Sequence, residues 1–265
     1  MIRKSLLAIF SSLGLAIAVP NAALAGSNVK VTPAKPHGWT TADTRPGGAV
    51  NFIVDATAPL GKGALQLTTD TTTTAKAQYL HGATVPLADV SKLSYSTKQV
   101  SALFAGGDPS YQLIVYLNGG TDGFTTLVFE PYQNPAEGPV IPGKWQSWDV
   151  ASGLFWSTRK VTCSNGTVAG TPGGPASYTL QQIKTLCPSA VSGGFGVNIG
   201  SNNPGYNVET DAFNFNGTTY NFEPARPAEN EDSCKGSEDS AVSNPSPGQG
   251  ECVSDAARQH DSEAD

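Results

Sequence analysis

Trp145, Trp148 and Trp156 lie close together in the sequence and are the residues best suited to recognise a ligand. A flat indole ring stacks on the apolar C–H face of a sugar, although many tryptophans serve only to pack a core. Because Trp145 and Trp148 are three residues apart, they point to opposite faces of a regular strand. We therefore expect one of these two side chains to enter the core and the other to be exposed.

Polar and aromatic neighbours complete a candidate glycan site. A carboxylate accepts hydrogen bonds from sugar hydroxyls, and a tyrosine adds a second stacking surface. The predicted ligand contacts are Trp148, Trp156, Tyr132, Glu130 and Asp149.

Two carboxylates at alternate positions raise the question of catalysis. Glu209 and Asp211 fall on the same face of a strand, and a retaining glycosidase needs two carboxyl groups about 5 Å apart. The run resembles the E-x-D-x-E pattern of laminarinase-like jelly-roll glucanases, but Phe213 occupies the place of the third acid. We read both acids as structural and predict no catalytic residue.

Other reaction classes lack their motifs. The sequence contains no G-x-S-x-G, H-E-x-x-H or phosphate-binding glycine loop. The segment Asn118–Gly123 could offer Asp122 to calcium, but its spacing is not that of a calcium loop and favours a plain hairpin turn. We predict neither a metal site nor a cofactor.

The four cysteines form an even set, Cys163, Cys187, Cys234 and Cys252. No two have the C-x-x-C spacing of a zinc site, so two disulfides are expected. Three pairings are possible, and proximity in the sequence favours Cys163–Cys187 and Cys234–Cys252.

Short runs of β-branched and aromatic residues, separated by turn residues, predict about ten strands. They are 50–56, 63–69, 75–81, 93–98, 111–117, 124–129, 145–150, 194–199, 206–215 and 218–222. The spacing is typical of an all-β, two-sheet β-sandwich or jelly roll. One helix is predicted over Thr179–Leu186, with Thr179 and Gln182 as a capping box and Pro188 as its end.

The two ends of the chain differ from this pattern. Residues 1–25 have a basic start, an apolar run and the Ala23-Leu24-Ala25 cleavage pattern, which predicts a secretory signal peptide. Residues 26–49 predict an irregular lead-in and residues 50–224 the β-sandwich domain. Residues 225–265 predict an acidic, disordered tail holding one small disulfide loop.

Charge also limits the partners. Residues 224–265 carry ten acidic and three basic residues, whereas residues 26–223 carry 12 acidic and 11 basic residues. A nearly neutral domain has no charge pattern for nucleic acid or anionic lipid. We therefore expect an uncharged partner such as a neutral glycan, and no membrane association once the signal peptide is cleaved.

Several segments resemble a group of secreted bacterial β-sandwich proteins that are similar to carbohydrate-binding modules and lectin-like jelly rolls. The segments are 63–69, 93–97, 126–132, 143–149, 210–213 and 220–224. The tail, through Cys234-Lys235-Gly236 and 248–254, resembles a cysteine motif at the C-termini of actinobacterial exported proteins, without that motif's aromatic residues. The resemblance implies a sandwich fold and a bacterial source, and it assigns no activity.

Three functions remain open. The first is a secreted or envelope-associated, non-catalytic β-sandwich that binds a neutral glycan through exposed aromatic residues. The second is a jelly-roll glycan hydrolase or lyase with Glu130, Asp149 or Asp211 among its acids. The third is a structural envelope protein that binds other proteins.

Overall fold

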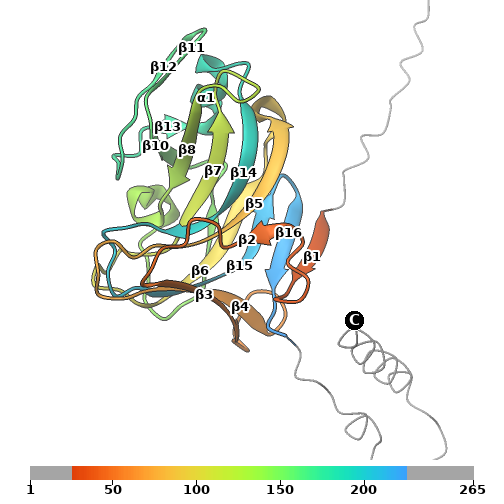
Figure 1. Ribbon diagram of the computed structural model, residues 1–265, viewed down its shortest axis with the longest axis vertical. Helices are drawn as coiled ribbons and strands as arrows, with labels where there is room; N and C mark the ends of the chain where they lie inside the picture. The colour runs from red at the N-terminus through yellow and green to blue at the C-terminus, as the bar shows by residue number, and fades with distance from the viewer. Residues whose placement is uncertain (1–25, 226–265) are drawn as a thin grey trace, which may run out of the picture.

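The computed structural model describes residues 26–225, which form a β-sandwich of two seven-stranded sheets (Figure 1). The first sheet contains β1 (Ser27–Val31), β3 (Gly48–Val54), β4 (Gly63–Thr69), β6 (Leu93–Ser101), β9 (Gln146–Asp149), β15 (Asn207–Phe215) and β16 (Thr218–Phe222). The second sheet contains β2 (Trp39–Thr40), β5 (Ala77–Pro86), β7 (Ser110–Tyr116), β8 (Phe124–Phe129), β10 (Leu154–Ser157), β13 (Tyr178–Thr179) and β14 (Val191–Ile199). The all-β, two-sheet prediction is confirmed.

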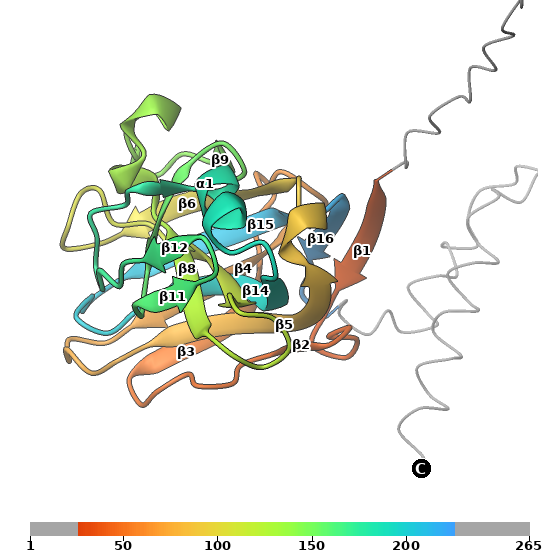
Figure 2. The same ribbon diagram turned by 90° about the horizontal axis from the view of Figure 1, so that it is seen from above.

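Strand β15 is the centre of the first sheet. It pairs with β6 along one side, and with β4 and then β16 along the other. A bulge at Ala212, whose φ is 49°, shifts the alternation, so that Phe213 faces the core after Asp211 has faced outward. Strand β1 runs parallel to β16 at the edge of this sheet (Figure 2).

The second sheet has the order β13-β10-β8-β7-β14-β5-β2, and its middle strands lie side by side in Figure 1. Its inner face meets the first sheet in an aromatic core. Trp39, only 2% exposed, packs its ring within 5.6 Å of six other ring centroids. These rings belong to Tyr79, His81, Phe195, Phe213, Tyr220 and Phe222.

Helix α1 (Leu180–Leu186) begins at the predicted cap. The Thr179 hydroxyl accepts from the Gln182 backbone N–H at 3.1 Å, and the Gln182 side chain accepts from the Thr179 N–H at 2.8 Å. Three short 3-10 helices lie at Leu87–Asp89, Pro131–Gln133 and Pro135–Glu137. Within residues 26–225, no helix has the length and apolar character needed to cross a membrane.

The predicted Cys163–Cys187 disulfide is present and joins the hairpin of β11 (Val161–Cys163) and β12 (Gly166–Val168) to the end of α1. The two cysteines are 24 residues apart in the sequence. A closed loop of that length stabilises the fold by about 3.5 kcal/mol in the chain-entropy model. The Cys234–Cys252 pair, the signal peptide and the acidic tail lie outside the described residues.

The lead-in predicted as irregular is in fact partly strand, because β1, β2 and the start of β3 fall within residues 26–49. Strand β10 was also not predicted. These elements are held by their neighbours rather than by their own hydrophobic pattern, since β1 adds to β16 and β2 adds to β5. The predicted hairpin at Asn118–Gly123 is confirmed, with Gly119, Gly120 and Gly123 at positive φ between β7 and β8.

Candidate functional site

The outer face of the second sheet is hollowed into a groove of about 690 Å³. Five neighbouring strands contribute to it, in the order β10, β8, β7, β14 and β5. At about 4.8 Å per strand, the four steps between them span about 19 Å. The groove is therefore long enough for an extended ligand of several repeating units.

Cross-strand register places the outward side chains of these strands in rows. Because residues two apart along a strand share a face, each row lines up one residue from each strand. The first row is Gln78, Asn198 and Ser110; the second is Leu80, Gly196, Gln112, Val128 and Trp156; the third is Gly82, Gly194, Ile114 and Thr126, with Thr158 alongside.

Strand β14 adds no side chain to the middle of this face, because its outward positions 194 and 196 are glycines. A Cβ at Gly196 would collide with the carbonyl oxygen of Tyr79, and one at Gly194 with that of His81. Strand β5 lies so close that neither position accepts a larger residue. The glycines therefore keep the centre of the face low, while side chains rise on either side.

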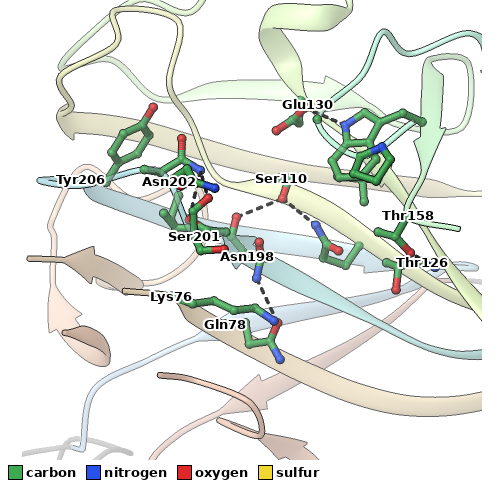
Figure 3. A pocket seen from close by; sticks show the side chains of 18 of the residues that line it. Lys76, Gln78, Ser110, Thr126, Glu130, Thr158, Asn198, Ser201, Asn202 and Tyr206 are labelled. Atoms are coloured by element: carbon green, nitrogen blue, oxygen red, sulfur yellow. Dashed lines mark hydrogen bonds between the residues drawn. The ribbon is translucent and has the colours of Figure 1, made fainter. Parts of the chain in front are cut away.

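The polar side chains of the first row are fixed by hydrogen bonds to one another (Figure 3). Asn198 Nδ2 donates to Gln78 Oε1 at 3.0 Å, and Ser110 Oγ donates to the Asn198 carbonyl at 3.0 Å. Gln112 Nε2 donates to Ser110 Oγ at 2.7 Å. Among the described residues, no group donates to the side-chain oxygens of Asn198 and Gln112. Both are therefore free to accept from a ligand hydroxyl.

One end of the groove is aromatic. The Trp156 indole is half-buried, and its Nε1 donates to Glu130 Oε2 at 2.7 Å, as the dashed line in Figure 3 shows. Tyr132 is 43% exposed and Phe104 51% exposed, and their rings meet edge to face with centroids 5.2 Å apart. Tyr206 closes this end, with its hydroxyl packed against Gly107.

Two carboxyl groups lie at the same end. Burial raises the pKa of Glu130 above its ordinary value, although hydrogen bonds from Trp156 and Gln133 partly oppose the shift. Burial raises the pKa of Asp108 to about 7. The Thr97 hydroxyl donates to Asp108 Oδ2, whereas Oδ1 is buried with no hydrogen-bond partner. A carboxyl group with a perturbed pKa in a cleft, as at Glu130, is typical of functional sites. The Asp108 carboxyl is instead buried against Thr97 of the first sheet.

Asp108 should make stability depend on pH. Its pKa rises from 3.8 in the unfolded chain to about 7 on folding, so the native state holds the extra proton between these values. Stability therefore falls as pH rises from about 4 to about 7. We expect Asp108→Asn to increase the free energy of unfolding at about pH 8, by up to about 4 kcal/mol. The gain should disappear near pH 4, as denaturant unfolding at several pH values can test.

The control for this prediction is Asp149→Asn, which removes an exposed carboxylate on the first sheet. Its effect on the free energy of unfolding should be small at every pH. A uniform loss of stability in Asp108→Asn from pH 4 to pH 8 would contradict the assigned protonation.

The structure brings together three of the five predicted ligand contacts. Glu130, Tyr132 and Trp156 all line the groove. Trp148 and Asp149 do not, because β9 belongs to the first sheet. Whether the three groove residues contact a ligand stays a prediction.

The prediction that Trp148 contacts a ligand therefore needs correction, because this side chain lies in the core. Of the two tryptophans expected on opposite faces, Trp148 is the one that enters the core, where it is 1% exposed. It pairs with the inward-facing Tyr95 of β6, and its Nε1 donates to Thr97 Oγ1 at 2.7 Å. Trp145 is the outward one, half-buried, with Nε1 donating to Asp55 Oδ2 at 3.0 Å. A core side chain cannot stack on a sugar.

The two carboxylates at alternate positions of β15, Glu209 and Asp211, have structural partners. Glu209 forms an ion pair with Lys98, which also pairs with Asp55. Asp211 accepts from the backbone N–H of Leu60 at 2.9 Å and of Phe222 at 3.0 Å. These bonds fasten the 55–62 loop and β16 to the first sheet, on the side of the sandwich opposite the groove.

The sequence reasoning missed the polar part of the groove. Gln78, Ser110, Gln112, Thr126 and Asn198 were not singled out, although each alternates with an apolar residue of its strand. The alternation indicated a polar outer face, and the paired outward glycines of β14 were the available indication that this face is hollow. Neither pattern shows which strands lie next to each other.

No protein-family model and no curated protein matches this sequence. Among solved structures, a family 11 carbohydrate-binding module from Clostridium thermocellum, in complex with a β-1,3-1,4-mixed-linked tetrasaccharide, is similar at 12% identity and TM-score 0.39, over 69% of this chain and 90% of that one. A family 22 xylan-binding domain from Paenibacillus barcinonensis is 16% identical, with TM-score 0.30, over 71% of this chain and 88% of that one. A β-1,2-glucanase from Parabacteroides distasonis is 13% identical, with TM-score 0.35, over 71% of this chain and 23% of that one. At these values, the function of this chain is inferred from its own groove.

Proposed function

We propose that this protein is an exported, non-catalytic module that binds a polysaccharide chain in the groove of the second sheet. The observation that supports this most is the composition of the groove. An indole ring at one end, fixed amide and hydroxyl groups along the floor and an open, elongated shape suit a ligand with apolar faces and many hydroxyl groups. A sugar chain has both features at every unit.

Each part of the ligand has a matching group in the groove. The Trp156 ring offers a stacking surface whose orientation is fixed by Glu130. The side-chain oxygens of Asn198 and Gln112 accept from hydroxyls, and the Thr126 hydroxyl can donate or accept. Because hydrogen bonds hold these side chains before binding, the protein loses little side-chain conformational entropy when the ligand binds.

Export is supported by the disulfide. A bond such as Cys163–Cys187 is typical of oxidising compartments, and it agrees with the signal peptide predicted from residues 1–25. We therefore place the proposed ligand outside the cell or in its envelope.

The test is native affinity electrophoresis of the full-length protein in gels that contain neutral polysaccharides, including β-1,4-glucan, mixed-linked β-glucan and xylan. We expect at least one polymer to retard migration of the protein. A soluble oligosaccharide of the same polymer should compete for the groove and restore migration. Migration unchanged in every gel would contradict glycan binding and would favour the structural envelope role.

A glycoside hydrolase is the second candidate, favoured by Glu130 and Asp108. Both residues line the groove, and burial raises the pKa of each carboxyl group, as an acid catalyst requires. Release of reducing ends from a polysaccharide that binds would establish hydrolysis. The proposed binding module should release none during prolonged incubation.

A further inference from the structure

The connection from β6 to β7 carries the most exposed aromatic side chain of the groove. It comprises residues 102–109 and crosses from the first sheet to the second. Phe104, Gly107 and Asp108 of this connection line the groove. The Gly107 N–H donates to the Phe104 carbonyl at 2.8 Å and closes a tight turn, which we call the Phe104 turn and define as residues 104–107. Phe104 stays exposed in it, although burial would stabilise a large apolar side chain.

A buried side chain from the opposite sheet holds the Phe104 turn. Gln99 of β6 is 3% exposed and lies opposite the core residue Val208. Its Nε2 donates to the carbonyl of Ala105 at 3.1 Å, to that of Phe104 at 3.4 Å and to that of Gly107. A buried amide is costly unless it is hydrogen-bonded, so the position of Gln99 depends on the turn. The turn depends on Gln99 in the same way, because this one side chain binds three of its carbonyl groups.

Other inward side chains of β6 hold other parts of the connection. Tyr95 lies four residues before Gln99, so both side chains face the core. Tyr95 Oη donates to the carbonyl of Pro109 at 2.7 Å, at the β7 end of the connection. Among residues 26–225, Gln99 is the only residue whose side chain donates to the Phe104 turn.

Two glycines allow three aromatic rings to meet at the turn. A Cβ on Gly106 would lie 2.8 Å from the Phe104 ring and 3.1 Å from Tyr132 Cβ, and a Cβ on Gly107 would overlap the Tyr206 ring. Phe104 and Tyr132 meet edge to face. The Phe104 ring is therefore held between the turn and Tyr132, with about half of the side chain open to solvent.

We infer that Phe104 forms a further sugar-stacking subsite of the groove, and that Gln99 is the residue that positions it from the first sheet. This inference rests on the proposed function, because it adds a contact to the same groove. Val128 pairs with Trp156, and Tyr132 comes four residues after Val128, so the new subsite lies beyond Trp156 at the end of β8. A sugar chain stacked on Trp156 can extend towards it. Because the ring is held before binding, stacking costs little side-chain entropy.

The test is isothermal titration calorimetry of the full-length protein with hexasaccharides of β-1,4-glucan, mixed-linked β-glucan and xylan. Phe104→Ala removes an exposed ring, and we expect it to weaken hexasaccharide binding about tenfold. Gln99→Met keeps the length of the side chain but cannot donate to the turn, so it should weaken binding to a similar extent. The double variant should bind as tightly as Phe104→Ala alone, since Gln99 then has no ring to position.

Tyr95→Phe is the matched control. It removes one buried hydrogen bond between the same strand and the same connection, away from the Phe104 turn. The variant should have a lower melting temperature than the wild type, because a buried acceptor loses its donor. Its hexasaccharide affinity should be unchanged.

A second measurement needs no substitution of Gln99. In protein labelled with 4-fluorophenylalanine, the ¹⁹F resonance of Phe104 is identified by its absence in Phe104→Leu. We expect this resonance to shift saturably as hexasaccharide is added. In ¹H–¹⁵N spectra, the side-chain amide of Gln99 should shift in the same titration. The side-chain amide of Gln146, which donates to Pro139 beside the first sheet, should not.

Three results separate the inference from the proposed function. Wild-type affinity in Phe104→Ala, or a Phe104 resonance that does not move, overturns the subsite and leaves glycan binding in the groove standing. An equal loss from Gln99→Met with and without the Phe104 ring, or a Gln99 amide that does not move, overturns the positioning role. No binding of any hexasaccharide, together with no retardation in any polysaccharide gel, overturns both the inference and the proposed function.

Discussion

Replacement of Trp156 with alanine is expected to weaken polysaccharide binding by about thirtyfold or more, the effect of losing a binding hot spot. The indole is the largest side chain in the second row of the groove, and it is fixed by its hydrogen bond to Glu130. Its removal takes away a stacking surface and leaves Glu130 without one of its two hydrogen-bond donors. Calorimetry of the variant with the best-binding oligosaccharide measures the loss.

The chain contains a matched control for this substitution. Trp145 is also half-buried, and its Nε1 also donates to a carboxylate, Asp55 Oδ2, but it lies beside β9 in the first sheet. Trp145→Ala should therefore keep the wild-type affinity. Equal losses in the two variants, or an unchanged affinity in Trp156→Ala, would contradict the assignment of the groove.

The second large effect is on stability. Trp148→Ala is expected to lower the free energy of unfolding by about 3–5 kcal/mol, since it empties a large volume in the core. The indole is 1% exposed, and its hydrogen bond to Thr97 is buried. Each kcal/mol lowers the melting temperature by about 2–4 °C in a domain of this size. Thermal unfolding followed by circular dichroism provides the measurement.

Trp148→Phe separates packing from hydrogen bonding. Phenylalanine retains much of the core volume but cannot donate to Thr97, so its melting temperature should lie between those of the wild type and Trp148→Ala. A loss below about 1 kcal/mol in Trp148→Ala would mean that the side chain is not the core element described above.

Local patterns in the sequence predicted much of the sandwich. The runs at Gly63–Thr69, Phe124–Phe129 and Thr218–Phe222 are strands with those limits, because turn residues bound each alternating run. The cap at Thr179 is equally local, since it needs only Gln182 three residues later.

Features that depend on neighbouring strands could not be predicted in this way. Strand β2 has only two residues and exists because Trp39 and Thr40 add to the edge of β5. The direction of Trp148 was ambiguous, because a strand's alternation shows that two residues face opposite ways but does not show which way is inward. Pairing with Tyr95 of β6 decides it.

The groove follows the same rule. Gln78, Asn198 and Ser110 are far apart in the sequence and meet only because β14 lies between β5 and β7. Glu130, Tyr132 and Trp156 were predicted from residue type alone, and the structure places them beside this row. Residue type alone thus indicated the aromatic end of the groove. The polar floor could be recognised only from the pairing register of five strands.

The measurement that tests the central claim most directly is a ¹H–¹⁵N correlation titration of the full-length protein with the best-binding oligosaccharide. The four tryptophans give separate indole N–H resonances on different parts of the molecule. Binding in the groove predicts saturable shifts of the Trp156 indole and of the side-chain amides of Gln112 and Asn198, while the Trp145 indole stays unchanged. Shifts centred on Trp145 and the first sheet, with Trp156 unmoved, would contradict the claim that this groove binds the glycan.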